Sequence, residues 1–127
     1  MRLSLQYEGK AFSVYAIELD SGRCPAVDYL EQLRRTNPAS HRSMVAVLIA
    51  HAEHGPLLNR EKSRKIVGYT DLWEFKSRPG DRLLYFYLPG RRTVLTCGFH
   101  KGEPADSEFV KALGMKQDLV REAGNGG

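Results

Sequence analysis

The chain has 127 residues, of which 42% are hydrophobic and 27% are charged. This length predicts one domain with one core, and the composition is typical of a soluble globular chain, not of a disordered or fibrous one. The longest apolar run, residues 44–50, is much shorter than the roughly 20 residues of a membrane-spanning helix. Because the N-terminal stretch also lacks the apolar region of a secretory signal, we expect a cytoplasmic protein.

The net charge of +4 is unevenly distributed along the chain. Residues 60–101 carry ten Lys or Arg against four Asp or Glu, a net charge of +6, and the remainder carries −2. Aromatic side chains are interleaved with these cations. Since cations bind phosphates and aromatic rings stack on bases, nucleic acid is the leading partner class. A solvated basic face is the alternative.

The first half of the chain predicts a hairpin and two helices. Alternating apolar residues predict a strand over residues 11–19, with residues 3–8 as a short candidate partner. Pro25 opens a helix that the Asn37-Pro38 pair ends. Ser40 is the expected N-cap of a second helix, which ends at the next Gly-Pro pair.

The second half predicts three strands, over residues 72–78, 82–88 and 91–99, after an irregular basic connector. In the first, the aromatic residues share one face and Glu74, Lys76 and Arg78 share the other, charged face. The second and third strands are joined by a Pro-Gly turn. A register that pairs Leu88 with Arg91 places Arg82 opposite Cys97.

A last helix is expected from Pro104 to about Glu122, followed by a flexible tail over residues 123–127. The order β-α-α-β-β-β-α predicts an α+β domain over residues 1–122. Its mostly antiparallel, curved sheet is packed by two N-terminal helices and a C-terminal helix.

Several classes of chemistry have no support in the sequence. His51 and His54 are three residues apart, but no HExxH motif or nearby cysteine completes a metal site. Neither a GxSxG nucleophile motif nor a phosphate-binding glycine-rich loop occurs, so we expect no metal and no cofactor. With no CxxC pair, Cys24 and Cys97 are predicted to be reduced and structural.

A polar set lies on the strands expected to be neighbours: Glu74, Lys76, Arg78, Arg82, His100 and Lys101. A solubilising face usually mixes signs, whereas this set holds a single anion. Because clustered cations repel one another, the set predicts a surface that binds phosphate. The pattern does not separate binding from catalysis.

Three blocks in this region resemble the RelE/ParE superfamily of type II toxins, closest to its HigB-like, phage-derived branch. That branch repeats the pattern lyElR … yRvlYf … r.ivllhgF.KKt. The corresponding blocks here are LWEFK at 72–76, RLLYF at 82–86 and TVLTCGFHK at 93–101. With the flanking helices, the similarity covers most of residues 11–122.

The resemblance implies a toxin that cleaves mRNA in the ribosomal A site and is neutralised by a separate antitoxin, expected to be a helix-turn-helix protein. Such cleavage needs no cofactor, only an activated 2′-hydroxyl and a stabilised phosphate. In this interpretation Arg82 holds the scissile phosphate, and Lys76 and Lys101 bind or stabilise it. His100 is the candidate general acid or base, and an acidified lysine is the alternative.

Four further residues are expected to bind RNA: Arg78, Arg91 and Arg92 through phosphates, and Tyr85 by stacking on a base or, alternatively, only by packing. The expected register places His100 on the face opposite to Arg82. A bend or bulge at Gly98 would remove that conflict.

Gly102 and Glu103 depart from the branch, which usually carries a second lysine and a threonine there, and Cys97 stands where histidine is common. The loss of a cation and the gain of an anion favour a second interpretation, a decayed relative that only binds RNA or its antitoxin. A ParE-like gyrase inhibitor and a plain RNA-binding module are two further functions compatible with the basic sheet.

Overall fold

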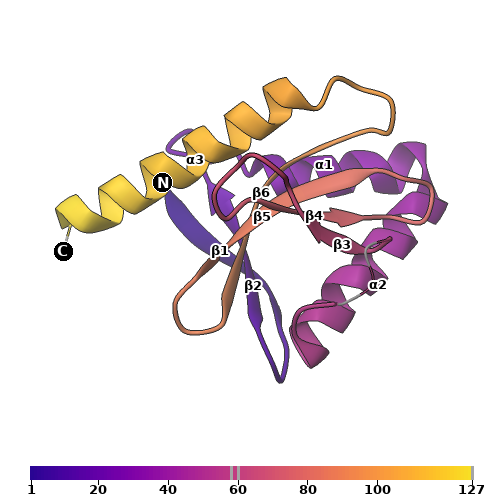
Figure 1. The fold of residues 1–127 in the computed structure, drawn as a ribbon, viewed down its shortest axis with the longest axis horizontal. Coiled ribbons are helices and arrows are strands. Elements are labelled where there is room, and N and C mark those ends of the chain that lie inside the picture. The colour runs from indigo at the N-terminus through magenta and orange to yellow at the C-terminus, as the bar shows by residue number, and fades with distance from the viewer. Residues whose placement is uncertain (58, 60, 127) are drawn as a thin grey trace.

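The computed structural model describes residues 1–57, 59 and 61–126, and within them six strands form one sheet (Figure 1). The strands are β1 (Arg2–Glu8), β2 (Ser13–Glu18), β3 (Ser63–Lys65), β4 (Trp73–Lys76), β5 (Arg82–Leu88) and β6 (Arg92–Phe99). The helices are α1 (Pro25–Thr36), α2 (Pro38–His54) and α3 (Asp106–Gly126). In space the strands follow the order β1-β2-β6-β5-β4-β3, and among the described pairs only β2 and β6 run parallel. The expected α+β class with a mostly antiparallel sheet is confirmed.

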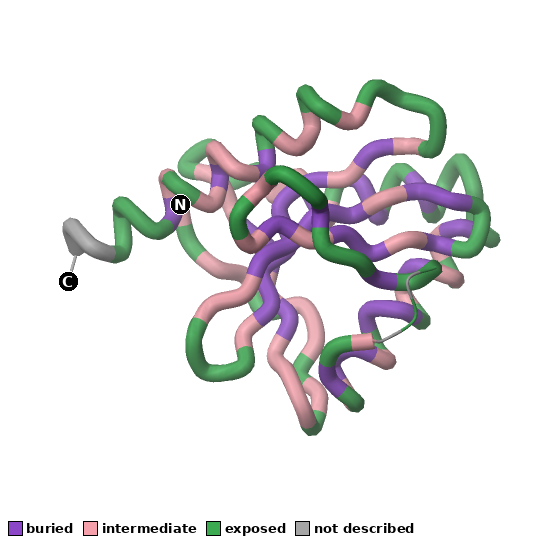
Figure 2. The backbone as a smooth tube through the Cα atoms, in the orientation of Figure 1, coloured by how far each residue is buried: buried purple, intermediate pink, exposed green. Residues whose placement is uncertain are grey.

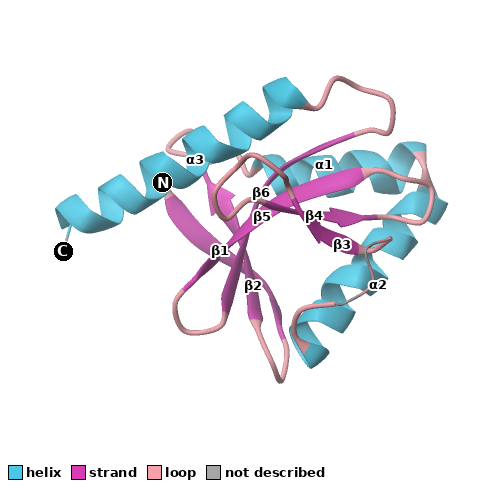
Figure 3. Cartoon of the chain, in the orientation of Figure 1, coloured by secondary structure: helices cyan, strands magenta, loops and turns pink. Residues whose placement is uncertain are grey.

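Helices cover both faces of the sheet (Figure 3). Alternate residues of β5 point to opposite faces, so Leu83 and Tyr85 pack with α1 and α2, whereas Leu84 and Phe86 pack with α3. The central strands are accordingly the most buried part of the backbone (Figure 2). Two hydrophobic clusters, one on each face, therefore hold β5 and β6 in place, and these two strands carry much of the predicted site.

The structure has two strands more than the expected order. The candidate hairpin partner at residues 3–8 is confirmed as β1, which pairs with β2. By contrast, β3 lies in the connector that we expected to be irregular, where it pairs with β4 as an edge strand. Three residues are too few for the period-two alternation by which strands are recognised in a sequence. The observed order is β-β-α-α-β-β-β-β-α.

The second helix begins earlier than expected. Its N-cap is Asn37, whose side chain accepts the backbone N–H of Ser40 at 3.2 Å, and Pro38 occupies the first turn. Asn37 thus ends α1 and starts α2, which a proline at the first helical position permits. Ser40, the expected N-cap, is instead a buried residue of the first turn.

The expected β5–β6 register is wrong by two residues at its far end. Leu88 pairs with Arg92, because Arg91 adopts a left-handed conformation (φ 56°) and belongs to the turn. A bulge between Leu83 and Tyr85 then adds one residue to β6, so Arg82 pairs with Phe99. Neither shift is visible in the alternation of apolar residues alone.

The C-terminal helix begins at Asp106 and continues to Gly126, four residues beyond the expected end at Glu122. Gly127, part of the tail expected to be flexible, lies outside the described residues. None of the helices that the structure describes combines the length and the apolar character needed to cross a membrane. Cys24 and Cys97 are both free thiols.

His51 is fully buried between α2 and the sheet. Its Nε2 lies 2.7 Å from Thr93 Oγ1, and the rings of Phe12 and Phe75 are about 5 Å away. Burial lowers the pKa of His51 from 6.5 to about 4. Within the described part of the chain no three His, Cys, Asp or Glu side chains gather to hold a metal ion.

Acidification should therefore destabilise the fold through His51. The unfolded chain binds a proton below pH 6.5 that the folded chain resists until about pH 4, so the free energy of unfolding should fall by about 2 kcal/mol from pH 7 to pH 5. Urea unfolding at the two pH values measures this. In the control variant His51→Gln, which can still bond Thr93 but cannot gain a charge, most of the difference should vanish; an unchanged difference would contradict the assignment.

Candidate active site

Three segments that are distant in the sequence meet at one place. They are the first turns of α2, the β4–β5 loop over residues 77–81 and the segment after β6 over residues 100–103. The backbone N–H of Arg78 donates to Ser43 Oγ of α2 at 2.6 Å. From the third segment, the backbone N–H of Lys101 donates to Asp81 Oδ1 at 3.3 Å. The loop is therefore held on both sides.

Asp81 is the shared contact of these segments, and its residue is only 6% exposed. Ser40 Oγ donates to its Oδ2 at 2.5 Å, and His100 Nδ1 lies 3.3 Å from its Oδ1. Ser77 extends the network, because its Oγ lies 2.6 Å from Ser40 Oγ and accepts the backbone N–H of Asp81 at 3.0 Å. The carboxylate is thus buried with hydrogen-bond partners on both oxygens, which offsets the cost of removing it from water.

The His100 side chain is 36% exposed and follows the last residue of β6. Its imidazole lies near the Tyr29 ring, with the two centroids 5.3 Å apart and the ring planes tilted by 39°. Tyr29 is itself fixed, because its hydroxyl donates to the carbonyl of Phe99 at 2.8 Å and its ring crosses Gly98. Burial raises the pKa of Tyr29, so its hydroxyl stays a protonated donor.

Arg82 is held on the same side of the sheet as Glu74. Glu74 is 1% exposed and pairs with Arg64 at 2.5 Å and with Arg82 Nε at 3.4 Å. Arg82 Nη1 also donates to the carbonyl of Gly80. We expected Glu74 on an open charged face of its strand; it is buried instead, because an arginine from β3 and one from β5 flank it and neutralise its charge.

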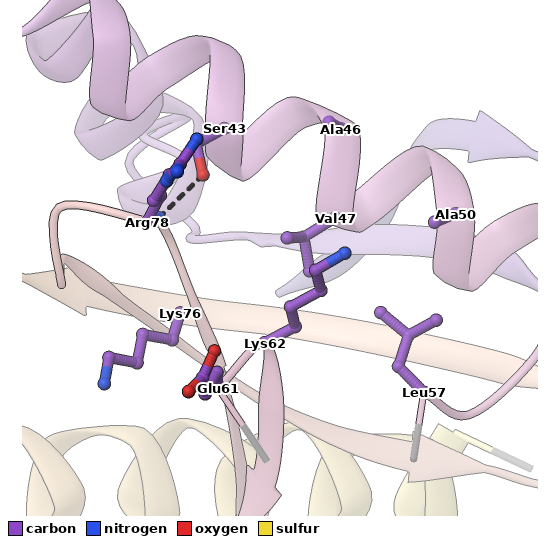
Figure 4. A pocket seen from close by; sticks show the side chains of 9 residues that line it. All are labelled: Ser43, Ala46, Val47, Ala50, Leu57, Glu61, Lys62, Lys76 and Arg78. Atoms are coloured by element: carbon purple, nitrogen blue, oxygen red, sulfur yellow. Dashed lines mark hydrogen bonds between the residues drawn. The ribbon is translucent and has the colours of Figure 1, made fainter. Parts of the chain in front are cut away.

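The remaining cations gather around the same loop. The stem of Lys101 lies over Gly80, where an added Cβ would come within 2.8 Å of Lys101 Cδ. Lys76 is the cross-strand partner of Arg82. Lys76 and Arg78 also line a groove of about 720 Å³ between α2 and the β3–β4 side of the sheet, with Arg78 and Ser43 at one end and Leu57 at the other (Figure 4).

We call Lys76, Arg78, Arg82, His100 and Lys101 the basic cluster. All five come from the β4 end, the β4–β5 loop, the β5 start and the segment after β6. The bulge in β6 occurs between the partners of Leu83 and Tyr85, immediately before Gly98. It does not bring His100 to the face of Arg82. Arg82 pairs with Phe99, and His100 points to the other face, where it meets Tyr29 and Asp81, so the two side chains flank the β4–β5 loop from opposite faces of the sheet.

Three predicted RNA contacts lie elsewhere. Tyr85 is completely buried, with its hydroxyl 2.7 Å from Ser63 Oγ and its ring 3.9 Å from that of Phe75. It has the packing role that was the alternative to stacking on a base. Arg91 and Arg92 lie at the β5–β6 turn, six strand residues from Arg82, a distance of about 20 Å at roughly 3.3 Å per residue.

The sequence did not mark Asp81, Ser40 or Tyr29 as site residues. Their partners lie 19 to 70 residues away, so no local spacing points to them. Asp81 offered one signal, since it follows a Pro-Gly pair and directly precedes Arg82.

The two departures at residues 102 and 103 have local structural roles. Gly102 has φ 89° in a turn closed by the backbone N–H of Glu103 on the carbonyl of His100 at 3.1 Å. This left-handed position favours glycine over lysine. Glu103 Oε1 accepts the backbone N–H of His100 at 3.2 Å and lies 4.0 Å from its Nε2. An anion therefore lies beside the candidate proton-transfer group.

A protein-family model described as phage derived protein Gp49-like (DUF891) matches residues 31–112. The matched range contains α2, β3 to β6 and every residue of the basic cluster. No curated protein matches the chain.

Gly98→Ala should destabilise the protein by about 1–3 kcal/mol, because the new Cβ would lie 2.4 Å from the Tyr29 ring and force it off β6. Gly114→Ala is the matched control: its Cβ meets nothing within 4 Å, and alanine favours the helix. Urea unfolding of both variants tests the contact. Equal stabilities of Gly98→Ala and the wild type would refute it.

Proposed function

The chain belongs to the phage-derived Gp49-like family, and on that premise we propose that it is the toxin of a type II toxin–antitoxin pair, an endoribonuclease that cleaves mRNA on the ribosome. The resemblance to the HigB-like branch of the RelE/ParE superfamily supports the finer assignment. One observation carries the proposal: four cations and a partly exposed histidine, from segments distant in the sequence, lie in or next to the β4–β5 loop. Such a surface can stabilise the negative charge that develops on a phosphate in the transition state.

The proposed reaction is attack of an RNA 2′-hydroxyl on the adjacent phosphorus. A base takes the 2′ proton, the new O–P bond forms a 2′,3′-cyclic phosphate, and the 5′-oxygen leaves with a proton from an acid. Negative charge builds up on the non-bridging oxygens in the transition state, so the protein must supply fixed positive charge and a proton carrier.

Arg82 is the proposed phosphate clamp. Its Nε faces Glu74 and its Nη1 bonds the Gly80 carbonyl, so the guanidinium is oriented before RNA binds. Its Nη2 has no hydrogen-bond partner among the described residues. A pre-oriented, permanently charged donor loses little freedom on binding a phosphate oxygen.

Lys101 and Lys76 are proposed to stabilise the transition state, with Arg78 adding positive charge along the groove. His100 is proposed to transfer the proton, since its ring is partly exposed and it directly precedes Lys101. Arg91 and Arg92, at the far end of β5, could contact only a different stretch of RNA. The partners proposed are the ribosome with its mRNA and a helix-turn-helix antitoxin.

The second candidate is a non-enzymatic relative that binds RNA or its antitoxin. The position of Glu103 favours it, because a carboxylate 4.0 Å from His100 Nε2 would repel an incoming phosphate. The structural reason for Gly102 weighs against decay, since the turn favours glycine at that position whether or not the site is active.

Arg82→Ala should abolish growth arrest and lower the yield of new mRNA 5′ ends at least about 100-fold, as expected when a transition-state donor is removed. Arg2→Ala is the matched control, an arginine of β1 in the same sheet that pairs with Glu18 and has no proposed RNA contact. New 5′ ends are mapped across translated frames after induction of each variant. Because Arg64 still pairs with Glu74, Arg82→Ala should fold, which circular dichroism and urea unfolding check.

Two results would overturn the nuclease proposal, and one would overturn only the role of Arg82. A folded Arg82→Ala variant that cuts as well as wild type would remove Arg82 from the site. Growth arrest with intact messages and gyrase-trapped DNA breaks would instead support the ParE-like alternative. Normal growth with intact messages, from folded wild-type protein, would support the non-enzymatic relative.

A further inference from the structure

We propose that Asp81 is a positioning residue that holds the His100 imidazole with the proton on Nδ1 and leaves Nε2 as the atom that exchanges protons with RNA. The catalytic part of this inference rests on the proposed nuclease function. The part that concerns the imidazole itself can be measured without any RNA.

The carboxylate of Asp81 is fixed before it meets the histidine. Ser40 Oγ donates to Oδ2 at 2.5 Å, and the backbone N–H of Lys101 donates to Oδ1 at 3.3 Å. Because Ser40 donates to Asp81, the Ser77 hydroxyl must donate in their 2.6 Å contact, and Ser77 Oγ in turn accepts the Asp81 N–H. This closed ring of hydrogen bonds leaves the carboxylate little freedom to turn away from His100.

The contact between Asp81 Oδ1 and His100 Nδ1, at 3.3 Å, sets the tautomer. An ionised carboxylate only accepts hydrogen bonds, so Nδ1 must carry the proton that it donates. In the neutral ring, Nε2 then has its lone pair free. A neutral imidazole with a bound Nδ1 proton can take a proton from a hydroxyl at Nε2 and later return one.

The orientation of the ring is fixed by a second contact. Tyr29 lies 5.3 Å from His100 between ring centroids, and the bond from its hydroxyl to the Phe99 carbonyl holds it against the end of β6. Nδ1 meets the buried Asp81 carboxylate and the side chain as a whole is 36% exposed, so we infer that the open edge of the ring is the Nε2 side. The other charged group near this edge within the described residues is Glu103, at 4.0 Å.

Asp81 therefore has a structural role and a role in the proposed chemistry. The same carboxylate that ties the β4–β5 loop to α2 also orients the proposed proton carrier, and its neighbour Arg82 is the proposed phosphate clamp. A residue whose role was merely structural could be replaced without changing which imidazole nitrogen carries the proton. This difference makes the assignment measurable.

The test is nitrogen-15 NMR of the histidine side chains in the full-length protein, recorded from pH 6 to pH 9 so that neutral rings are sampled. The His100 signals are assigned by their loss in His100→Gln. Wild type should show a protonated Nδ1 and an unprotonated Nε2. Asp81→Asn should shift His100 towards the Nε2-protonated form and lower single-turnover cleavage on programmed ribosomes about 10-fold to 100-fold.

Ser43→Ala is the matched control, because it removes the hydrogen bond between α2 and Arg78 of the same loop without touching Asp81 or its hydrogen-bond partners. It should leave the tautomer unchanged, even if it lowers stability as much as Asp81→Asn does. An Nε2-protonated His100 in wild type would overturn the inference, and so would an Nδ1-protonated His100 in Asp81→Asn. If wild type cleaves RNA, equal cleavage rates of Asp81→Asn and wild type would overturn its catalytic part.

The two proposals fail in different ways. If the tautomer responds to Asp81→Asn in a wild-type protein that cuts no RNA, the nuclease proposal is wrong and the positioning of His100 by Asp81 stands.

Discussion

A buried carboxylate, that of Asp81, is the contact on which the arrangement of the site depends. The carboxylate joins the first turn of α2 through Ser40 and the end of β6 through His100 and Lys101, and the backbone N–H of Asp81 donates to Ser77 Oγ within the β4–β5 loop. The hydrophobic clusters position the strands, and the hydrogen bonds of Asp81 fix the loop segments between them. Separating the three segments would leave a buried carboxylate without hydrogen-bond partners, which costs stability.

Features that repeat along the chain could be predicted from sequence. The apolar spacing from Pro25 to Asn37 predicted α1, and the alternation in residues 82–88 predicted β5, because each period follows from local backbone geometry. Pairing could not be predicted in the same way. The β5–β6 register depends on the left-handed Arg91 and on one extra residue in β6, both of which are local deviations from that period.

The same division applies to the candidate site. Arg82, Lys76, Lys101 and His100 were predictable because they are cations or titratable groups near strand ends, and the structure places them around one loop. Tyr85 has an aromatic ring of the kind that stacks on bases, but it is buried on the face of β5 that packs against α1 and α2. Asp81 and Tyr29 were missed because their roles come from partners up to 70 residues away, which only the tertiary fold brings near.

The nuclease proposal is tested most directly by the chemistry of the RNA ends that the purified protein leaves on ribosomes programmed with a defined message. We expect a 2′,3′-cyclic phosphate on the upstream fragment and a 5′-hydroxyl on the downstream fragment, since the attacking group is the neighbouring 2′-hydroxyl. Fragments ending in a 3′-hydroxyl and a 5′-phosphate, or a message that stays intact, would contradict it.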